Sequence, residues 1–282
     1  MTEASYIGET MQLEHEDTGS GAPTMVFIHG LCCDQTDWRP QVDRFAGSHR
    51  VIAVTLRGHG GQPAGPGNDA STLAMEQLAA DAVALLRKKG ITSAIVAGHS
   101  MGTRVVHEML AQAPDIVDGI VLVDGSDSAF GDLAPALRTF GEATSGSKLK
   151  AWLQGLFEAM FYGNEQAELR DACVARALRM PDENVRQLYT HMMRWDATKA
   201  DGIMRAIDVP TLVIQSTTRG PDGSRRALNE GEMGHYPGVV QARNRNASFA
   251  LLPGHGHFTM MEAPDWTYDA IASWMRDARL PR

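Results

Sequence analysis

The sequence predicts an α/β protein with a mostly parallel sheet, helices on both faces of that sheet and one helical insertion. Apolar runs of four or five residues recur along the chain, helical patterns separate them, and one long interval has no such run. Continuous apolar runs are typical of parallel strands that are buried on both faces. Strands that alternate with helices indicate parallel pairing through crossover helices.

Six apolar runs are predicted to be the parallel strands, and the segment Tyr6–Glu16 is expected to add an antiparallel strand at the edge. The six runs are Thr24–Ile28, Val51–Thr55, Ser93–Ala97, Ile120–Val123, Thr211–Ile214 and Ser248–Leu252.

Three segments with helical periodicity lie between or after these runs. Their ends carry ordinary helix signals: Gly90 follows the first, Pro114 follows the second, and a proline begins the third. The predicted helices are Leu73–Lys89, Arg104–Gln112 and Pro264–Arg276.

The interval without a buried strand runs from Ser126 to about Ala206 and contains the helical patterns Ala151–Phe161 and Glu183–Trp195. We expect it to form a helical cap over the sheet. The core is then residues 1–125 and 207–282, and the cap is residues 126–206. A length of 282 residues suits this division, because α/β cores often exceed 250 residues.

Composition restricts the partners. The net charge of −8 argues against a nucleic-acid partner, because phosphates would be repelled. The pair Arg225–Arg226 is expected on a solvated helix surface. No apolar run approaches 18 residues, and the segment Met1–Met11 lacks a basic stretch, so we expect neither a membrane partner nor a secretory signal.

The three cysteines also restrict the protein's class. Cys32 and Cys33 are adjacent and Cys173 is remote, so the spacing predicts neither a disulfide framework nor a zinc site. A reducing cytoplasm is the expected location.

The segment Gly98–Gly102 contains the motif G-x-S-x-G, between an apolar strand and a helix. A serine hydroxyl is a weak nucleophile, and a sharp turn holds it clear of the chain so that a base can reach it. The N-terminus of the following helix offers N–H donors to a developing oxyanion. This context indicates a catalytic Ser100 rather than a chance match in a glycine-rich chain.

Four segments, in this order and over nearly the whole chain, resemble the α/β-hydrolase superfamily. The resemblance implies the α/β-hydrolase fold, with a helical cap inserted after the sixth strand in the family's own count. The segments are Phe27–Gly30 (FIHG) after the family's third strand, Leu56–Gly60 (LRGHG) after its fourth, the Gly98–Gly102 elbow, and Pro253–Phe258 (PGHGHF) followed by Glu262-Ala263-Pro264.

The resemblance also implies roles for single residues. Ser100 corresponds to the nucleophile and His257 to its general base, and the backbone N–H groups of Leu31 and Met101 correspond to the oxyanion hole. His255 is a competing base, but the position before phenylalanine favours His257. Since the neutral imidazole is the base, activity is expected to rise with pH through about 6.5.

Two aspartates compete for the acid of the triad. The commonest family pattern places an Asp shortly after the strand that follows the cap, but Thr218 stands there. Asp222 is the nearest acid, within a run that is also a turn sequence. Asp124 follows an apolar strand and should lie at the carboxyl edge of the sheet, as in members that draw their acid from the earlier strand. We favour Asp124 and keep Asp222 as the alternative.

Together these features predict a serine esterase, similar to carboxylesterases, that cleaves a small, rather apolar carboxylic ester or lactone through an acyl-enzyme, with no cofactor or metal. A C–C bond hydrolase, a perhydrolase and a cofactor-free dioxygenase using a His–Asp pair on a heteroaromatic ring remain alternatives. Apolar cap side chains form either the cap core or the substrate pocket. The predicted pocket residues are Trp152, Phe157, Met160, Phe161, Met192 and Trp195.

Overall fold

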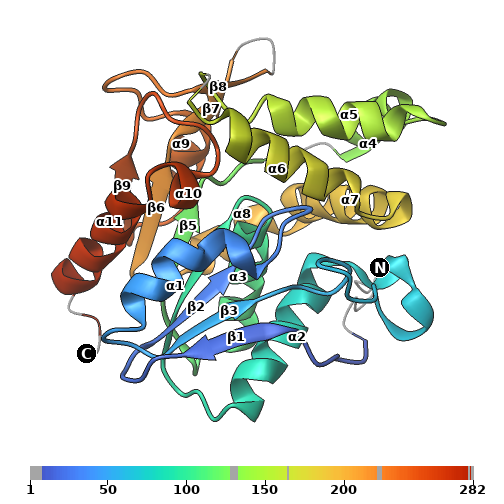
Figure 1. Cartoon of the computed structure of the whole chain (residues 1–282). Helices are drawn as coiled ribbons and strands as arrows, with labels where there is room; N and C mark the ends of the chain where they lie inside the picture. The colour runs from blue at the N-terminus through green and yellow to red at the C-terminus, as the bar shows by residue number, and fades with distance from the viewer. Residues whose placement is uncertain (1–7, 128–132, 164, 221–223, 279, 281–282) are drawn as a thin grey trace.

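A computed structural model describes residues 8–127, 133–163, 165–220, 224–278 and 280. Its main sheet has seven strands in the order β1-β3-β2-β4-β5-β6-β9 (Figure 1). Every neighbouring pair is parallel except β1 and β3, which are antiparallel. The strands are β1 (His15–Thr18), β2 (Thr24–Ile28), β3 (Val51–Val54), β4 (Ala94–His99), β5 (Val117–Val123), β6 (Thr211–Gln215) and β9 (Ala247–Leu251).

All six predicted parallel strands are present, with ends that differ by three residues or fewer at each end. The expected antiparallel edge strand is also present, but β1 lies nearer the end of the predicted segment and extends past it. Its sequence is polar, which suits a strand with one free edge. Central strands such as β2, β3 and β4 are buried along their whole length.

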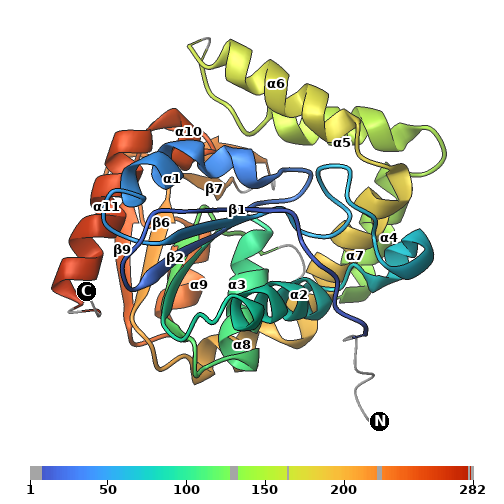
Figure 2. The same cartoon turned by 60° about the horizontal axis from the view of Figure 1, so that its bottom comes forward.

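Helices cover both faces of the sheet, which is why the strand sequences are continuously apolar. Figure 2 shows the two layers. One layer contains α1 (Arg39–Phe45), α10 (Thr259–Glu262) and α11 (Pro264–Asp277), and the other contains α2 (Met75–Lys88), α3 (Gly102–Gln112), α8 (Ala200–Ala206) and α9 (His235–Gln241). The three predicted helices correspond to α2, α3 and α11.

Four further helices lie over the edge of the sheet where its parallel strands end (Figure 1). They connect β5 to β6. The described chain has one strand before β2, whereas the family's count has two. The strand labelled β5 here therefore corresponds to the family's sixth strand. These helices are α4 (Leu133–Ala143), α5 (Lys148–Glu158), α6 (Ala167–Leu178) and α7 (Asp182–Thr198). The next helix, α8, packs against both α3 and α7. The division of the chain at residues 126 and 206 stays a prediction.

A short antiparallel ribbon follows β6 and consists of β7 (Thr217–Arg219) and β8 (Arg225–Ala227). The expectation of a solvated helix at Arg225–Arg226 is therefore wrong. Successive side chains of a strand point to opposite faces. The side chain of Arg225 is only 12% exposed, whereas Arg226 is 39% exposed and pairs with Glu232.

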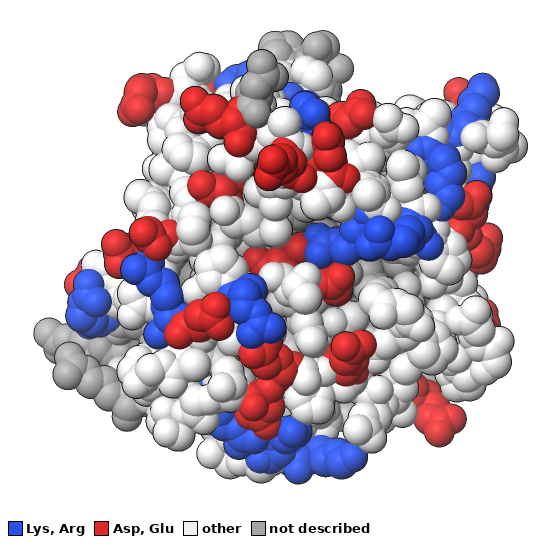
Figure 3. All heavy atoms as spheres, viewed as in Figure 1, with Lys and Arg blue, Asp and Glu red and all other residues white. Residues whose placement is uncertain are grey.

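On the face viewed in Figure 3, basic and acidic side chains are interspersed. Throughout the described residues, each helix is too short or too polar to cross a membrane.

Candidate active site

Ser100 lies in a sharp turn between β4 and α3, where its φ angle is +53°. Non-glycine residues rarely adopt this conformation, so the surrounding structure must hold it. The flanking glycines allow the close packing of this turn. A Cβ at Gly98 would lie 2.4 Å from the carbonyl oxygen of Gly102, and one at Gly102 would lie 2.6 Å from that of His29.

Asp124 and His257 are brought together from different parts of the sheet edge. Asp124 follows β5 with a φ angle of +44°, and His257 lies just before α10. His257 Nδ1 is 2.9 Å from Asp124 Oδ1, and both side chains are buried. An Nδ1–H that donates to Asp124 leaves Nε2 as the proton acceptor. Asp222, the alternative acid, lies outside the described residues.

The expected bond between Ser100 and His257 is not formed in this structure. Both residues line one cavity, but within the described residues the buried Nε2 of His257 has no hydrogen-bond partner. Such bonds are often long in unliganded enzymes and shorten when substrate binds. His255, the competing base, does not line this cavity and contacts the carbonyl oxygen of Pro253 instead.

The Asp124 carboxylate accepts hydrogen bonds from a polar segment that begins at the end of β6. The backbone N–H of Ser216 donates to Oδ2 at 2.8 Å, and Gln215 Nε2 donates to Oδ1 at 3.2 Å. The hydroxyls of Ser216 and Thr217 also donate to the carboxylate. These are the residues that replace the family's usual Asp pattern. Their polar character directly after a buried strand was the available signal for this role.

The predicted oxyanion donors come from two turns that meet at Ser100. A Cβ at Gly30 would lie 3.2 Å from Ser100 Cβ, so the turn containing Leu31 passes close to the nucleophile. Met101 directly precedes α3, and neither its N–H nor that of Leu31 is used in the backbone hydrogen bonds of the described chain. These are the two N–H groups that the family resemblance assigns to the oxyanion hole.

The cavity beside Ser100 is small, about 30 Å³, which is space for roughly one water molecule. Helices α5 and α7 contribute to its wall. The cavity is lined by Leu31, Cys33, His99, Ser100, Ser126, Leu156, Phe157, Met160, Tyr189, Met192, Arg219, Arg225, His257 and Phe258.

Three of the six predicted pocket residues line this cavity: Phe157, Met160 and Met192. The other three do not. The sequence could not separate the two groups, because helical periodicity shows that a side chain is buried but not which neighbour it faces. Their actual contacts are with other groups: Trp152 packs on Phe140 and Tyr189, Phe161 stacks on Phe258, and Trp195 lies beside His107 and donates its indole N–H to Glu108.

Two arginines were missed by the sequence reasoning. Arg219 and Arg225 line the cavity from the β7–β8 ribbon. Arg225 Nη1 is 2.7 Å from Thr217 Oγ1, 3.0 Å from His257 Nδ1 and 3.7 Å from Asp124 Oδ1. Because Nδ1–H is directed to Asp124, we infer that the guanidinium acts on the imidazole as a nearby charge.

This environment changes the titration of the pair. Burial and the charges of Arg225 and Arg219 lower the pKa of His257 well below its ordinary value, so the acid limb of activity is expected below the reference of about 6.5. Burial raises the pKa of Asp124, whereas Arg225 and the two hydroxyl donors act in the opposite direction.

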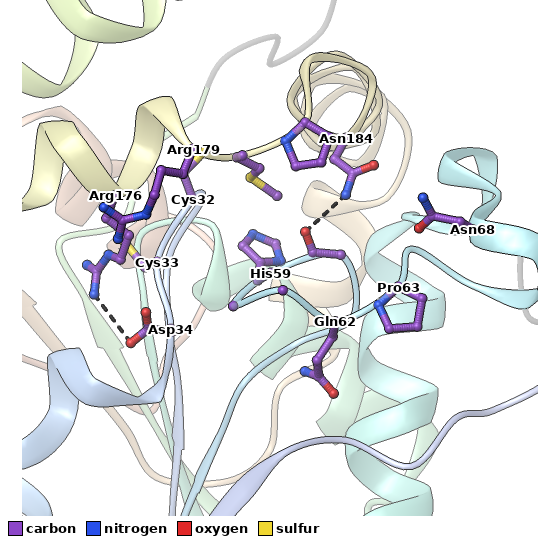
Figure 4. Close-up of a pocket in the computed structure, with 15 residues that line it drawn as sticks. Cys32, Cys33, Asp34, His59, Gln62, Pro63, Asn68, Arg176, Arg179 and Asn184 are labelled. Carbon is purple, nitrogen blue, oxygen red and sulfur yellow. Dashed lines mark hydrogen bonds and ion pairs between the residues drawn. The ribbon is translucent and has the colours of Figure 1, made fainter.

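A larger cleft of about 770 Å³ lies next to the cavity, between the turns after β2 and β3 and the helices α6 and α7 (Figure 4). Its wall includes polar contacts: Arg176 pairs with Asp34 at 3.3 Å, and Asn184 donates to the carbonyl oxygen of Gly58 at 3.0 Å. Cys33 lines both spaces, so the cleft adjoins the catalytic cavity. Across the described chain, groups of three or more His, Cys, Asp or Glu side chains suited to a metal do not occur.

Comparison with known proteins identifies the class to which this fold and site belong. The model of the "Alpha/beta hydrolase family" matches residues 25–270, and the chain therefore belongs to that family. An esterase from Thermogutta terrifontis has a similar structure, with a TM-score of 0.73, 22% identity and coverage of 94% of this chain and 93% of that chain. This likeness shows the fold.

Two curated relatives are each named "Dihydrolipoyllysine-residue acetyltransferase component of acetoin cleaving system". The relative from Cupriavidus necator is 34% identical over 149 residues, 52% of this chain, and the one from Pseudomonas putida is 26% identical over 261 residues, 92% of this chain. The matches span 38% and 65% of those proteins, respectively.

Proposed function

We propose that the protein is a serine hydrolase that cleaves a small carboxylic ester or lactone through an acyl-enzyme on Ser100. The observation that carries the proposal is the shared cavity: Ser100 stands in a strained turn, and it faces the same space as a histidine held by a buried aspartate. Family membership supports a hydrolase, and the paired oxyanion donors support acyl chemistry.

Each residue of the site has one role in the proposed reaction. Ser100 Oγ attacks the carbonyl carbon while Nε2 of His257 takes its proton, and the N–H groups of Leu31 and Met101 stabilise the oxyanion. The imidazolium then gives the proton to the leaving alcohol. A water molecule, deprotonated by the same imidazole, releases the acid and restores Ser100. Asp124 keeps His257 in the productive tautomer throughout.

The size of the cavity implies that the cap side chains move when substrate enters. A space of about 30 Å³ is small for an ester, and Phe157 and Met192 line it from α5 and α7. Methionine adapts to ligands of irregular shape, so Met192 is suited to this movement. In our proposal the protein acts in the cytoplasm on a small molecule without a cofactor.

The test replaces the nucleophile. Ser100→Ala should reduce hydrolysis of a panel of 4-nitrophenyl esters by several orders of magnitude, because the triad acts as a unit. A fluorophosphonate should label the wild-type protein once, at Ser100. The control Ser145→Ala changes an exposed serine outside the cavity and should leave both results unchanged.

Two outcomes would contradict the proposal. Label at another residue, or full esterase turnover in Ser100→Ala, would remove Ser100 as the nucleophile. Oxygen consumption with a heteroaromatic substrate that persists in Ser100→Ala would favour the cofactor-free dioxygenase. In that case the His257–Asp124 pair would act directly on the ring.

A further inference from the structure

The histidine of the nucleophile elbow, His99, is buried beside Ser100 and has no role in the reaction proposed above. It is the last residue of β4, it is 1% exposed, and its side chain lines the catalytic cavity. Burial lowers the pKa of His99 well below its ordinary value, so the ring is neutral. A neutral imidazole carries one N–H donor and one acceptor nitrogen, and the surroundings of the ring show which nitrogen is which.

One side of the His99 ring is hydrogen-bonded to the backbone of the general base. His99 Nε2 is 2.9 Å from the carbonyl oxygen of His257, and because a carbonyl oxygen only accepts, Nε2 carries the proton. The two residues are 158 positions apart in the chain, and their ring centroids are 4.7 Å apart. His99 is joined covalently to Ser100, so this one hydrogen bond connects the backbone of the nucleophile to that of the base.

The other side of the ring lies against the turn that contains the predicted oxyanion donor Leu31. A Cβ at Gly30 would lie 2.9 Å from His99 Nδ1 and 3.2 Å from Ser100 Cβ. Among the described residues Nδ1 has no hydrogen-bond partner. An apolar side chain would fill this space without the cost of an unpaired buried nitrogen. The property that distinguishes an imidazole at this position is therefore the N–H that reaches His257.

Other backbone groups around His257 attach its loop to different parts of the molecule. The N–H of His257 donates at 2.8 Å to the carbonyl oxygen of Met160, which lies between α5 and α6. The N–H groups of Gly256 and Phe258 donate to the carboxylate of Glu262 in α10, each at 2.9 Å. These bonds hold the loop to the helices, whereas the bond from His99 holds it to the turn of the nucleophile.

We propose that His99 is a positioning residue that holds the His257 loop at the distance from Ser100 that proton transfer requires. The two groups must come within hydrogen-bond reach, and a misplacement of about 1 Å can reduce the rate about 100-fold. Nε2 of His257 has no partner within the described residues, so the reacting geometry depends on how the two backbones are held. This inference rests on the proposed function, and it gives a role to the residue that the G-x-S-x-G motif leaves unspecified.

The experiment separates the hydrogen bond of His99 from the space that its ring fills. His99→Met has an apolar side chain of similar length without a donor. It should lower kcat on 4-nitrophenyl esters by up to about 100-fold with little change in KM, because the lost alignment matters in the transition state. His99→Gln retains a terminal N–H that can donate to His257, and it should recover most of the lost kcat. Labelling of Ser100 by a fluorophosphonate should slow in the same order.

His107, in the helix that follows the elbow, provides the matched control. It is buried, its Nδ1–H donates to the carbonyl oxygen of Thr103 at 2.7 Å, and its Nε2 has no partner in the described part of the chain. His107 does not line the catalytic cavity. His107→Met should therefore leave kcat unchanged, and denaturant unfolding would measure the stability of both methionine variants. An equal loss of kcat in the two would overturn the inference, as would a His99→Gln variant no more active than His99→Met.

A polar variant keeps the inference testable if His99→Met does not fold. The side chain of His99→Asn is one carbon shorter than that of His99→Gln, so its amide does not reach His257 and kcat should stay low. Equal kcat values in these two variants would contradict the positioning role.

Failure of this inference is distinct from failure of the proposed function. If Ser100→Ala loses turnover but His99→Met retains full kcat, His99 is not a positioning residue and the serine hydrolase stands. If turnover persists in Ser100→Ala, the proposed function is wrong and the role of His99 is lost with it.

Discussion

The position of the Asp124 carboxylate depends on hydrogen bonds from other residues more than on the sequence around Asp124. Asp124 is buried directly after β5. The groups that donate hydrogen bonds to it belong to Gln215, Ser216 and Thr217, where β6 ends and β7 begins. A buried carboxylate without such partners would be costly. The same donors fix the carboxylate with its Oδ1 atom 2.9 Å from His257 Nδ1.

Asp124→Asn should reduce turnover by about 10⁴-fold with the fold retained, as acid-to-amide changes do in other triads. The amide cannot hold His257 in the tautomer with Nδ1–H as the carboxylate does. The matched control is Asp127→Asn, three residues further along, whose carboxylate pairs with His235 at 3.0 Å instead. Steady-state kinetics and circular dichroism would check this, and a larger loss in Asp127→Asn would refute the assignment of Asp124.

The pH profile tests the charges around His257, which is faced by Asp124, Arg225, Arg219 and His99. Burial and the two arginines lower its pKa, so the imidazole stays neutral, and active, below the ordinary histidine range. Activity should fall only on acidification beyond that range. Arg225→Gln removes a positive charge and should raise the pKa, moving the acid limb to higher pH. An acid limb that moves to lower pH in this variant would contradict the expected direction of the pKa change.

At the scale of elements, the elbow between β4 and α3 is built on the close approach of two backbones. Gly102 lies against the carbonyl oxygens of Ile28 and His29, at the end of β2. Backbone atoms cannot move aside as a flexible side chain can. The turn that exposes Ser100 therefore requires the neighbouring strand as much as its own sequence.

Gly102→Ala should destabilise the protein by about 1–3 kcal/mol, the usual range for overpacking. The added Cβ would lie 2.6 Å from the carbonyl oxygen of His29 and 2.7 Å from that of Ile28. Gly155→Ala, within α5 and in open space, should instead stabilise by up to about 1 kcal/mol through helix propensity. Denaturant unfolding measures both. Two variants of equal stability would show that the elbow can relax.

At the scale of the whole molecule, a buried ion pair joins one of the helices above the sheet to the core. Arg104 of α3 and Asp196 of α7 form two hydrogen bonds, at 2.8 and 2.7 Å, and both side chains are almost inaccessible to solvent. Asn184 of α7 also reaches the carbonyl oxygen of Gly58. These contacts hold α7 against the core, where its Met192 lines the same cavity as Ser100.

Asp196→Ala should destabilise the protein by about 3–5 kcal/mol, because it leaves a buried guanidinium without its partner. The exposed pair Arg87–Asp115 is the comparison, and Asp115→Ala should cost less than about 1 kcal/mol. Denaturant unfolding followed by tryptophan fluorescence would measure both changes. Similar values for the two variants would mean that the buried pair does not hold α7 on the core.

The sequence by itself determined the sheet, its coverage by helices and the order of the motifs. Short contiguous segments of sequence are enough to indicate a buried parallel strand or a glycine-flanked turn. The strands β2 and β4 and the elbow at Ser100 could therefore be identified from their own residues. It also placed Asp124 at the sheet edge, because the carboxyl ends of parallel strands meet there.

Only the tertiary structure decided which side chains meet across the sequence. It placed Trp152, Phe161 and Trp195 outside the cavity, and it turned Arg225 toward His257, 32 residues away. Periodicity reports burial, but the identity of the buried neighbour depends on how α5, α7 and the β7–β8 ribbon pack. The charge at the catalytic cavity is therefore a property of packing, because residues distant in the chain supply it together.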